Sequence, residues 1–249
     1  PHVDRLVQSC LMEVDPRGTV VRYELHDGVI HSHARMTYTD VNAIVADRDP
    51  VLRERYAPLV PLFDLMHEVF EVLQSRRHRR GSIDFDLPET EVVLSEYGDI
   101  EAIVASERNV AHRLIEEFMI TANVAAATAL EAKRAPVVYR VHAEPARDKL
   151  DPLREFLGSL GYSLAKGQVL KPSMFTRILE KAAATGEAEL ISTVILRTQA
   201  QAVYQPDNIG HFGLALVRYA HFTSPIRRYA DLLVHRSLVR AYDLGDGPL

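Results

Sequence analysis

Two runs of alternating apolar and polar residues open the chain, one on each side of Asp-Pro-Arg-Gly at 15–18. A period of two is typical of a half-buried strand, and this tetrapeptide favours a tight turn. Residues 5–30 are therefore predicted to form a β-hairpin. Two or three strands are also predicted within 82–107, one at 137–142, and short ones within 210–222.

Helical spacing separates these strands. From Pro58 to Leu73 apolar residues recur every three or four positions, and they predict a helix that ends at Gly81. A long, alanine-rich helix is predicted from Asn109 to about Arg134. Other helices are predicted after a cap at Thr37 or Thr39, at 148–161, 171–186 and 188–204, and from Pro225 with Ser224 as N-cap.

Antiparallel strands with helices between and after them predict an α+β fold rather than a doubly wound parallel sheet. No repeat or low-complexity linker divides the 249 residues, so one domain is expected. The single cysteine, Cys10, excludes an internal disulfide, and no run of about 18 apolar residues indicates a membrane span. Without a signal-peptide pattern the chain is expected to be cytoplasmic, and without an initial methionine it is expected to be a fragment or a processed product.

The charge is uneven along the chain. The formal net charge of −5 disfavours broad binding to nucleic acid, which basic domains usually carry out. Yet five arginines stand between His211 and Arg240 with one acid, Asp231, and residues 75–81 read SRRHRRG. The second cluster is expected to be solvated, because the C-terminal end of a helix favours cations. Local basic strips on an acidic body favour a site for an anion.

Arg227 and Arg228 are placed where the positive end of the last predicted helix should repel them. One interpretation is a surface ion network, in which both arginines pair with Asp231 and Asp231 also holds His235. The other is a phosphate site, in which free helix amides, a guanidinium group and the hydroxyl of Ser224 bind the anion together.

The helix predicted from Asn109 carries a polar seam on an apolar body. The seam consists of residues at helical spacing: Asn109, His112, Arg113, Glu116 and Asn123. Buried polar groups need partners, so the seam is either a satisfied internal network or a functional site. Glu117 can pair with Arg113, four residues earlier, which would leave Glu116 as the freer carboxylate.

Tyr38 and Phe85 lie at predicted strand ends beside polar residues, where they could stack on bases or simply pack at the rim of the core. Asp84 and Asp86 share a strand face and are compatible with a metal site or with a solvated edge. The chain has no H-x-x-x-H pair, zinc-like cysteine set, P-loop or G-x-G-x-x-G, which argues against zinc and nucleotide-cofactor enzymes.

Residues 221–236, HFTSPIRRYADLLVHR, resemble the signature of the RNB catalytic domain of ribonuclease II and ribonuclease R, which are 3′→5′ exoribonucleases. The resemblance is closer to ribonuclease R. Other segments resemble the family in the family's own order: VDRLVQSCLMEVD, GVIHSHARMTYTDV, RLIEEFMITANVAAA, YRVHAEP and HFGLALVRYAHFTSPIRRY. The resemblance covers nearly the whole chain and implies an RNB-type α+β domain.

The resemblance also implies roles for single residues. Arg227 matches an arginine at the scissile phosphate that is required for cleavage, and Glu116 matches a glutamate that contacts ribose and favours RNA over DNA. Tyr38 matches a tyrosine that lines the pocket of the 3′-terminal nucleotides, and Phe85 matches an aromatic residue that stacks on the terminal bases. Beside them, Ser224 and Arg228 are expected to bind RNA.

The family's Mg²⁺ is held by aspartates of a D-x-x-D-F-D-D-like motif upstream of the hairpin, and residues 1–249 contain no such motif. The resemblance therefore implies one partial RNB domain, incomplete on its N-terminal side. Its implied partners are single-stranded RNA, the remainder of the domain, and flanking cold-shock and S1 OB-fold domains.

The implied activity is processive, Mg²⁺-dependent hydrolysis that releases nucleoside 5′-monophosphates, with this piece alone inactive. The alternative is a catalytically inactive RNA-binding or regulatory relative. An aspartate cluster before Pro1 would favour the nuclease, and its absence would favour the binding protein.

Overall fold

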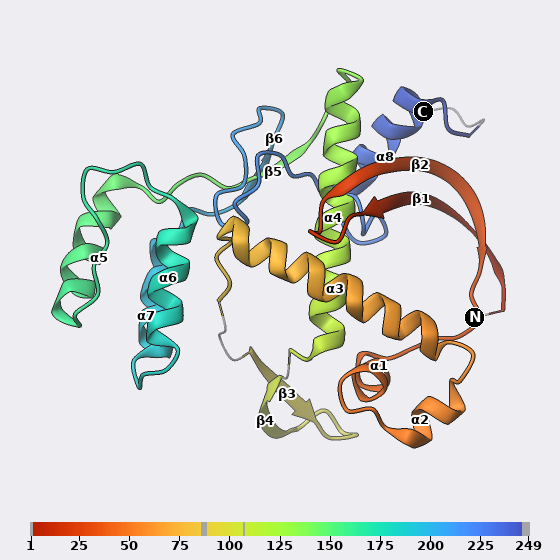
Figure 1. The fold of residues 1–249 in the computed structure, drawn as a ribbon, viewed down its shortest axis with the longest axis horizontal. Helices are drawn as coiled ribbons and strands as arrows, with labels where there is room; N and C mark the ends of the chain where they lie inside the picture. The colour runs from red at the N-terminus through yellow and green to blue at the C-terminus, as the bar shows by residue number, and fades with distance from the viewer. Residues whose placement is uncertain (1, 86–88, 107, 246–249) are drawn as a thin grey trace.

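A computed structural model describes residues 2–85, 89–106 and 108–245 (Figure 1). Within these ranges the chain forms α-helices and three two-stranded antiparallel sheets, so the α+β prediction is confirmed. Nowhere in the same ranges does a helix reach the length and hydropathy that a membrane span requires.

The N-terminal hairpin pairs β1 (Asp4–Val14) with β2 (Val20–His31) and confirms the predicted hairpin. The Asp15 carboxylate fixes its turn, because it accepts hydrogen bonds from the backbone amides of Arg17 (2.9 Å) and Thr19 (2.7 Å). Figure 1 shows the two strands as a long, curved ribbon on one side of the molecule.

Three helices follow the hairpin. α1 (Tyr38–Val45) is capped by the hydroxyl of Thr37, and α2 (Pro50–Arg55) is a short connecting helix. α3 (Val60–Arg80) ends at Gly81, whose φ of 77° lies in the left-handed region that favours glycine, as the sequence predicts. α1 and the start of α3 share a small apolar cluster: Ile44, Val45, Val60 and Phe63.

The predicted long helix is α4 (Val110–Ala132), capped by Asn109, and it passes through the middle of the fold where α3 crosses it (Figure 1). Its alanine-rich second half packs against β5 (Tyr139–Val141), which pairs with β6 (Val203–Gln205), and against α8 (Tyr229–Tyr242). Small side chains let these elements approach closely. The main hydrophobic cluster includes Leu25, Ala126, Ala127, Leu130, Val141, Ala220, Val234 and Leu238.

A second hydrophobic cluster lies among α5 (Arg147–Ser159), α6 (Pro172–Ala182) and α7 (Ala188–Thr198). Figure 1 shows these three helices on the side of the molecule opposite to the N-terminal hairpin. Between α3 and α4, β3 (Glu89–Leu94) pairs with β4 (Ile100–Ser106), and these are two of the two or three strands predicted within 82–107.

Two predictions in the region 188–222 are wrong. The helix predicted to reach Tyr204 ends at Thr198, because the next residues extend to pair with β5 as β6. Residues 210–222 form isolated bridges rather than strands, for example between Tyr139 and Ala220. In both places tertiary pairing outweighs the local pattern.

The last helix also begins later than predicted. Its first residue is Tyr229 and its N-cap position is Arg228, whereas Ser224 and Pro225 belong to a preceding turn. The backbone amides of Arg227 and Arg228 both donate to the carbonyl oxygen of Ser224, at 3.3 and 3.1 Å. The physical reason is the buried carboxylate of Asp231, which accepts a hydrogen bond from the backbone amide of Ser224.

Candidate functional site

The polar seam of α4 faces three other parts of the chain. His112 meets the start of α1, Glu116 meets the end of α3, and Asn123 meets the segment 219–224. At a rise of 1.5 Å per residue these positions span about 16 Å along the helix. The seam that the sequence indicates is therefore an elongated strip of α4 that contacts three segments distant in the sequence.

Tyr38 stacks on His112 at one end of the seam, with ring centroids 4.0 Å apart and planes inclined by 23°. The side-chain oxygen of Asn109 lies 2.8 Å from Nδ1 of His112 and so holds that ring in place. Tyr38 nevertheless remains 46% exposed. An exposed aromatic ring in a fixed orientation can stack on a nucleic-acid base.

Glu116 is bound by two arginines, so it is not the free carboxylate that the sequence suggested. Nη1 of Arg77 donates to its Oε1 at 2.8 Å, and Arg108 donates to its Oε2. Burial alone would raise the pKa of Glu116, but the hydrogen bonds from the two guanidinium groups outweigh burial, and the pKa is lowered. The carboxylate therefore stays ionised while its side chain remains 34% exposed.

The predicted pair of Glu117 with Arg113 does not form. Glu117 is buried, and its Oε1 accepts a hydrogen bond of 2.6 Å from Nη1 of Arg77. The Arg113 guanidinium instead lies 6.0 Å from the ring centroid of Phe70. Because α3 crosses α4 here, Arg77 reaches both adjacent carboxylates at once, and a buried carboxylate needs such a partner.

Arg77 belongs to the basic cluster that the sequence predicts to be solvated, and for this residue the prediction is wrong. Arg77 is only 8% exposed. It follows Phe63 and Phe70 at intervals of seven residues, which places it on the buried stripe of α3. The apolar periodicity of α3 therefore indicates that position 77 is buried. The neighbouring basic residues favoured the opposite prediction, a solvated cluster.

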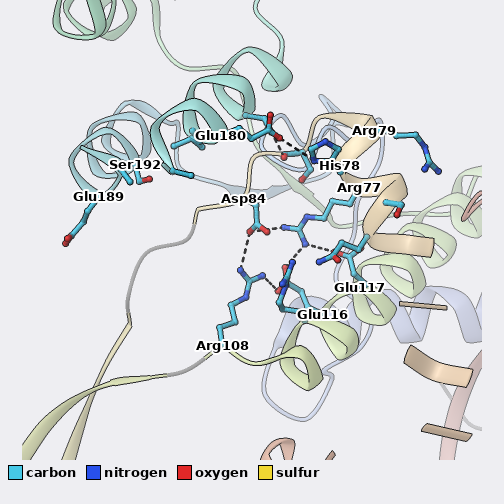
Figure 2. A pocket seen from close by; sticks show the side chains of 18 residues that line it. Arg77, His78, Arg79, Asp84, Arg108, Glu116, Glu117, Glu180, Glu189 and Ser192 are labelled. Atoms are coloured by element: carbon cyan, nitrogen blue, oxygen red, sulfur yellow. Dashed lines mark hydrogen bonds and ion pairs between the residues drawn. The ribbon is translucent and has the colours of Figure 1, made fainter. Parts of the chain in front are cut away.

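A cavity of about 760 Å³ opens beside this ion network, between the end of α3, the first half of α4, and helices α6 and α7. Figure 2 shows the side chains of Arg77 and Arg108 converging on Asp84 and Glu116 at its wall. Among the residues predicted to bind or cleave RNA, only Glu116 lines this cavity, together with Asp84 and Arg113, which the sequence indicates as a candidate metal ligand and as part of the seam. Arg108 is a second residue of this network, and no motif or helical spacing in the sequence indicates it.

Phe85 follows Asp84 and is half-buried against the hydrophobic cluster of α5, α6 and α7. The packing alternative therefore describes its surroundings, and the residue as a whole remains partly exposed.

At the other end of the seam, the buried side chain of Asn123 makes hydrogen bonds to residues 219–223. Its oxygen accepts hydrogen bonds from the backbone amides of Phe222 (2.8 Å) and Thr223 (3.2 Å), and its nitrogen donates to the hydroxyl of Tyr219 (3.0 Å). Glu116 lies seven residues earlier, on the same side of α4. The segment before Arg227 is thereby tied to the helix that carries Glu116.

Asp231 anchors the following turn from inside the protein. It is fully buried and accepts hydrogen bonds from the backbone amide of Ser224 (2.8 Å) and from Nε and Nη2 of Arg228 (2.7 and 2.8 Å). The predicted ion network is confirmed for Arg228 but not for His235, whose Nε2 lies 2.7 Å from the carbonyl oxygen of Phe222. The Asp231 carboxylate thus holds residues 224–228 as a turn and delays the start of α8.

Arg227 projects from this turn with an exposed side chain. In the part of the chain that the structure describes, its guanidinium group has no hydrogen-bond or ion-pair partner, so the predicted pair with Asp231 is wrong. At the start of this segment, burial lowers the pKa of His221 to about 4, and the positive charge of Arg228 contributes. An exposed guanidinium group at a fixed turn can bind an anion.

These residues do not form a magnesium site. No group of three or more histidine, cysteine, aspartate or glutamate side chains in residues 2–85, 89–106 and 108–245 could hold a metal ion. Asp84 pairs with Arg108 at 3.2 Å and with Arg77 at 3.5 Å, and Asp86 lies outside the described residues. Carboxylates that are already paired with arginines do not fit Mg²⁺.

Comparison with known proteins identifies the family. Residues 1–243 match the family model of the RNB domain, and the chain belongs to this family. Ribonuclease R of Vibrio cholerae serotype O1 is 46% identical over 238 residues, which cover 96% of this chain and 29% of that protein. Ribonuclease R of Escherichia coli K12 is 43% identical over 239 residues, which cover 96% of this chain and 29% of that protein.

A solved structure shows the same fold. Mycoplasma genitalium RNase R in complex with ribose methylated single-stranded RNA matches with a TM-score of 0.87 at 28% identity, over 96% of this chain and 37% of that one. The predicted RNB-type fold is confirmed. The chain spans less than a third of the length of the two curated relatives.

Proposed function

We propose that the chain is part of a 3′→5′ exoribonuclease that hydrolyses single-stranded RNA processively to nucleoside 5′-monophosphates. One observation carries the proposal. A chain of the RNB family gathers, along one helix, a stacked and exposed Tyr38, an ionised Glu116 and the turn that presents Arg227. The names of the relatives, ribonuclease R, favour this function over a catalytically inactive RNA-binding protein.

Each residue then has a task that its surroundings permit. Arg227 binds the phosphate that is cleaved and stabilises the charge that develops on it. Tyr38 and the partly exposed Phe85 stack on the terminal bases without reading their sequence. Glu116 accepts a hydrogen bond from the ribose 2′-hydroxyl, which distinguishes RNA from DNA.

Ser224 and Arg228 complete the RNA-binding turn. The hydroxyl of Ser224 donates a hydrogen bond to the RNA, while its backbone amide keeps donating to the carboxylate of Asp231. Arg228 acts mainly through Asp231 and keeps the turn in shape.

We propose that the activity also needs parts of the protein outside residues 1–249. We propose that a further segment supplies the Mg²⁺ ligands and completes the RNB domain, and that cold-shock and S1 domains help to bind the RNA. We place the protein in the cytoplasm, where a chain with the single thiol of Cys10 stays reduced.

The test is a degradation assay with the complete protein in Mg²⁺. Single-stranded RNA with a 5′ label, in excess over the protein, is expected to pass from full length to a short end product with few intermediate lengths, while the same RNA with a 3′ label is expected to release that label first, as a mononucleotide. Tight RNA binding with no shortening would contradict the proposal and support the catalytically inactive relative.

A further inference from the structure

Two arginines bind opposite oxygens of the Glu116 carboxylate, and they differ in how firmly they are held. Arg77 binds Oε1 from helix α3, and its side chain is 10% exposed. Arg108 binds Oε2 from the segment that joins β4 to α4, and its side chain is 39% exposed. Figure 2 shows both guanidinium groups at the wall of the cavity.

The anchorage of Arg77 does not depend on Glu116 alone. Glu117, with a side chain only 7% exposed, holds the same Nη1 at 2.6 Å, and Asp84 lies 3.5 Å from Nη2. If Arg77 moved away, the buried Glu117 would be left without its cation, which is strongly unfavourable. Among the residues that the structure describes, the other partner of Arg108 is the half-exposed Asp84, and water and salt weaken such contacts.

From this asymmetry we infer that Arg77 is a positioning residue for sugar selection. Arg77 keeps its hydrogen bond to Oε1 of Glu116 and so fixes the orientation of the carboxylate. When Arg108 releases Oε2, that oxygen faces the ribose 2′-hydroxyl and accepts a hydrogen bond from it. The inference rests on the proposed function, which assigns the ribose contact to Glu116. A carboxylate has about four acceptor positions, so the O–H of ribose can donate to Oε2 while Arg77 keeps Oε1.

The experiment measures kcat/KM of the complete protein on an RNA oligonucleotide and on the same oligonucleotide with 2′-deoxyribose at its 3′-terminal nucleotides. The variant Arg77→Lys keeps the charge but loses the planar fork that reaches two carboxylates. Its RNA-to-deoxy ratio is expected to fall by about tenfold, the scale of one hydrogen bond to a charged group. Glu116→Gln should lower the ratio similarly, and the double variant should fall no further.

A second variant guards against misfolding. Arg77→Met combined with Glu117→Gln removes the buried cation together with the buried charge that needs it, so the core stays electrically balanced. This variant is also expected to lose the preference for ribose. If Arg77 had only a structural role, its replacement would change the free energy of unfolding and leave the RNA-to-deoxy ratio of kcat/KM unchanged.

The matched control is Arg53→Lys. Arg53 also binds a carboxylate of α3, since its Nη1 and Nη2 lie 3.1 and 2.9 Å from the oxygens of Asp64, but it stands away from the cavity. Its replacement should affect unfolding and leave the ratio unchanged.

An unchanged ratio in both Arg77 variants would overturn the inference. So would a further fall when Arg77→Lys is added to Glu116→Gln, because Arg77 would then act by another route. Neither result touches the exoribonuclease proposal, which fails only if the complete wild-type protein does not shorten RNA.

Discussion

The side-chain oxygen of Asn123 on α4 accepts a hydrogen bond of 2.8 Å from the backbone amide of Phe222, 99 residues further along the chain. Asn123 is 1% exposed and Asp231 is fully buried. These two polar groups hold the two ends of the segment that leads to Arg227 and forms its turn. Buried hydrogen bonds therefore set the distance between the Glu116 helix and the Arg227 turn.

We expect Asn123→Ala to weaken both folding and cleavage. The change leaves the amides of Phe222 and Thr223 and the Tyr219 hydroxyl without their partner, at about 1–3 kcal/mol for each buried group left unsatisfied. Single-turnover cleavage should fall more than RNA affinity, because the turn is no longer held. The control is Thr128→Ala on the same helix, whose hydroxyl donates to the carbonyl oxygen of Val124 within its own helix. Equal effects of the two changes on cleavage would contradict this role for Asn123.

We expect Arg228→Ala to destabilise the protein by about 3–5 kcal/mol, because it leaves the fully buried charge of Asp231 without its cation. Replacing both partners, with Arg228→Met and Asp231→Leu, should recover part of this loss. Urea unfolding of the complete protein measures the free energy of unfolding of both variants. A double variant that is less stable than Arg228→Ala would show that the pair stabilises the turn by another means.

Acid should destabilise the region around His211. Burial lowers the pKa of His211 to about 3, and the nearby His142 contributes, whereas the ordinary value is 6.5. Between these values the unfolded chain binds more protons than the folded chain, so stability is full above pH 6.5 and falls as pH drops toward 3. His211→Asn should make the fall of the urea midpoint between pH 6.5 and 4.5 less steep. An unchanged slope would remove His211 from this account.

The 249-residue chain by itself is expected not to degrade RNA, even in abundant Mg²⁺, because the residues that the structure describes hold no cluster of metal ligands. Incubation of the pure chain with poly(A) tests this expectation. Metal-dependent trimming that survives purification would show that residues 1–249 contain a metal site, and would direct attention to Asp84 and Asp86.

Local pattern was enough to predict the regular elements near the N-terminus and α4. Alternation predicts β1 and β2, and the structure confirms Thr37, one of the two candidate caps, and the helix end at Gly81. The predicted start of the long helix at Asn109 is confirmed to within one residue, with Asn109 as its N-cap. The start of α8 could not be obtained in this way. Ser224 satisfies the rules for an N-cap, but its amide is taken by Asp231, seven residues later, and only the packed core explains why that carboxylate is buried.

The seam of α4 shows the same division. Helical spacing groups His112, Glu116 and Asn123 on one side, and the structure confirms the grouping. The partners of Glu116 depend on how α3 crosses α4 and on where residue 108 lies, and these are long-range facts. Arg77 was predictable in part, because its seven-residue spacing from Phe70 marks a buried position.

Arg227→Ala in the complete protein tests the central claim most directly. The claim is that the turn held by Asn123 and Asp231 presents the Arg227 guanidinium to the phosphate that is cleaved. Loss of one donor to a developing charge should slow the single-turnover rate by about 10²–10³-fold, while RNA affinity changes far less because stacking and other phosphate contacts remain. Arg227→Lys should rescue poorly, since an ammonium group lacks the planar fork. If Arg227→Ala weakens RNA binding and leaves the single-turnover rate intact, Arg227 only docks the RNA and the claim is wrong.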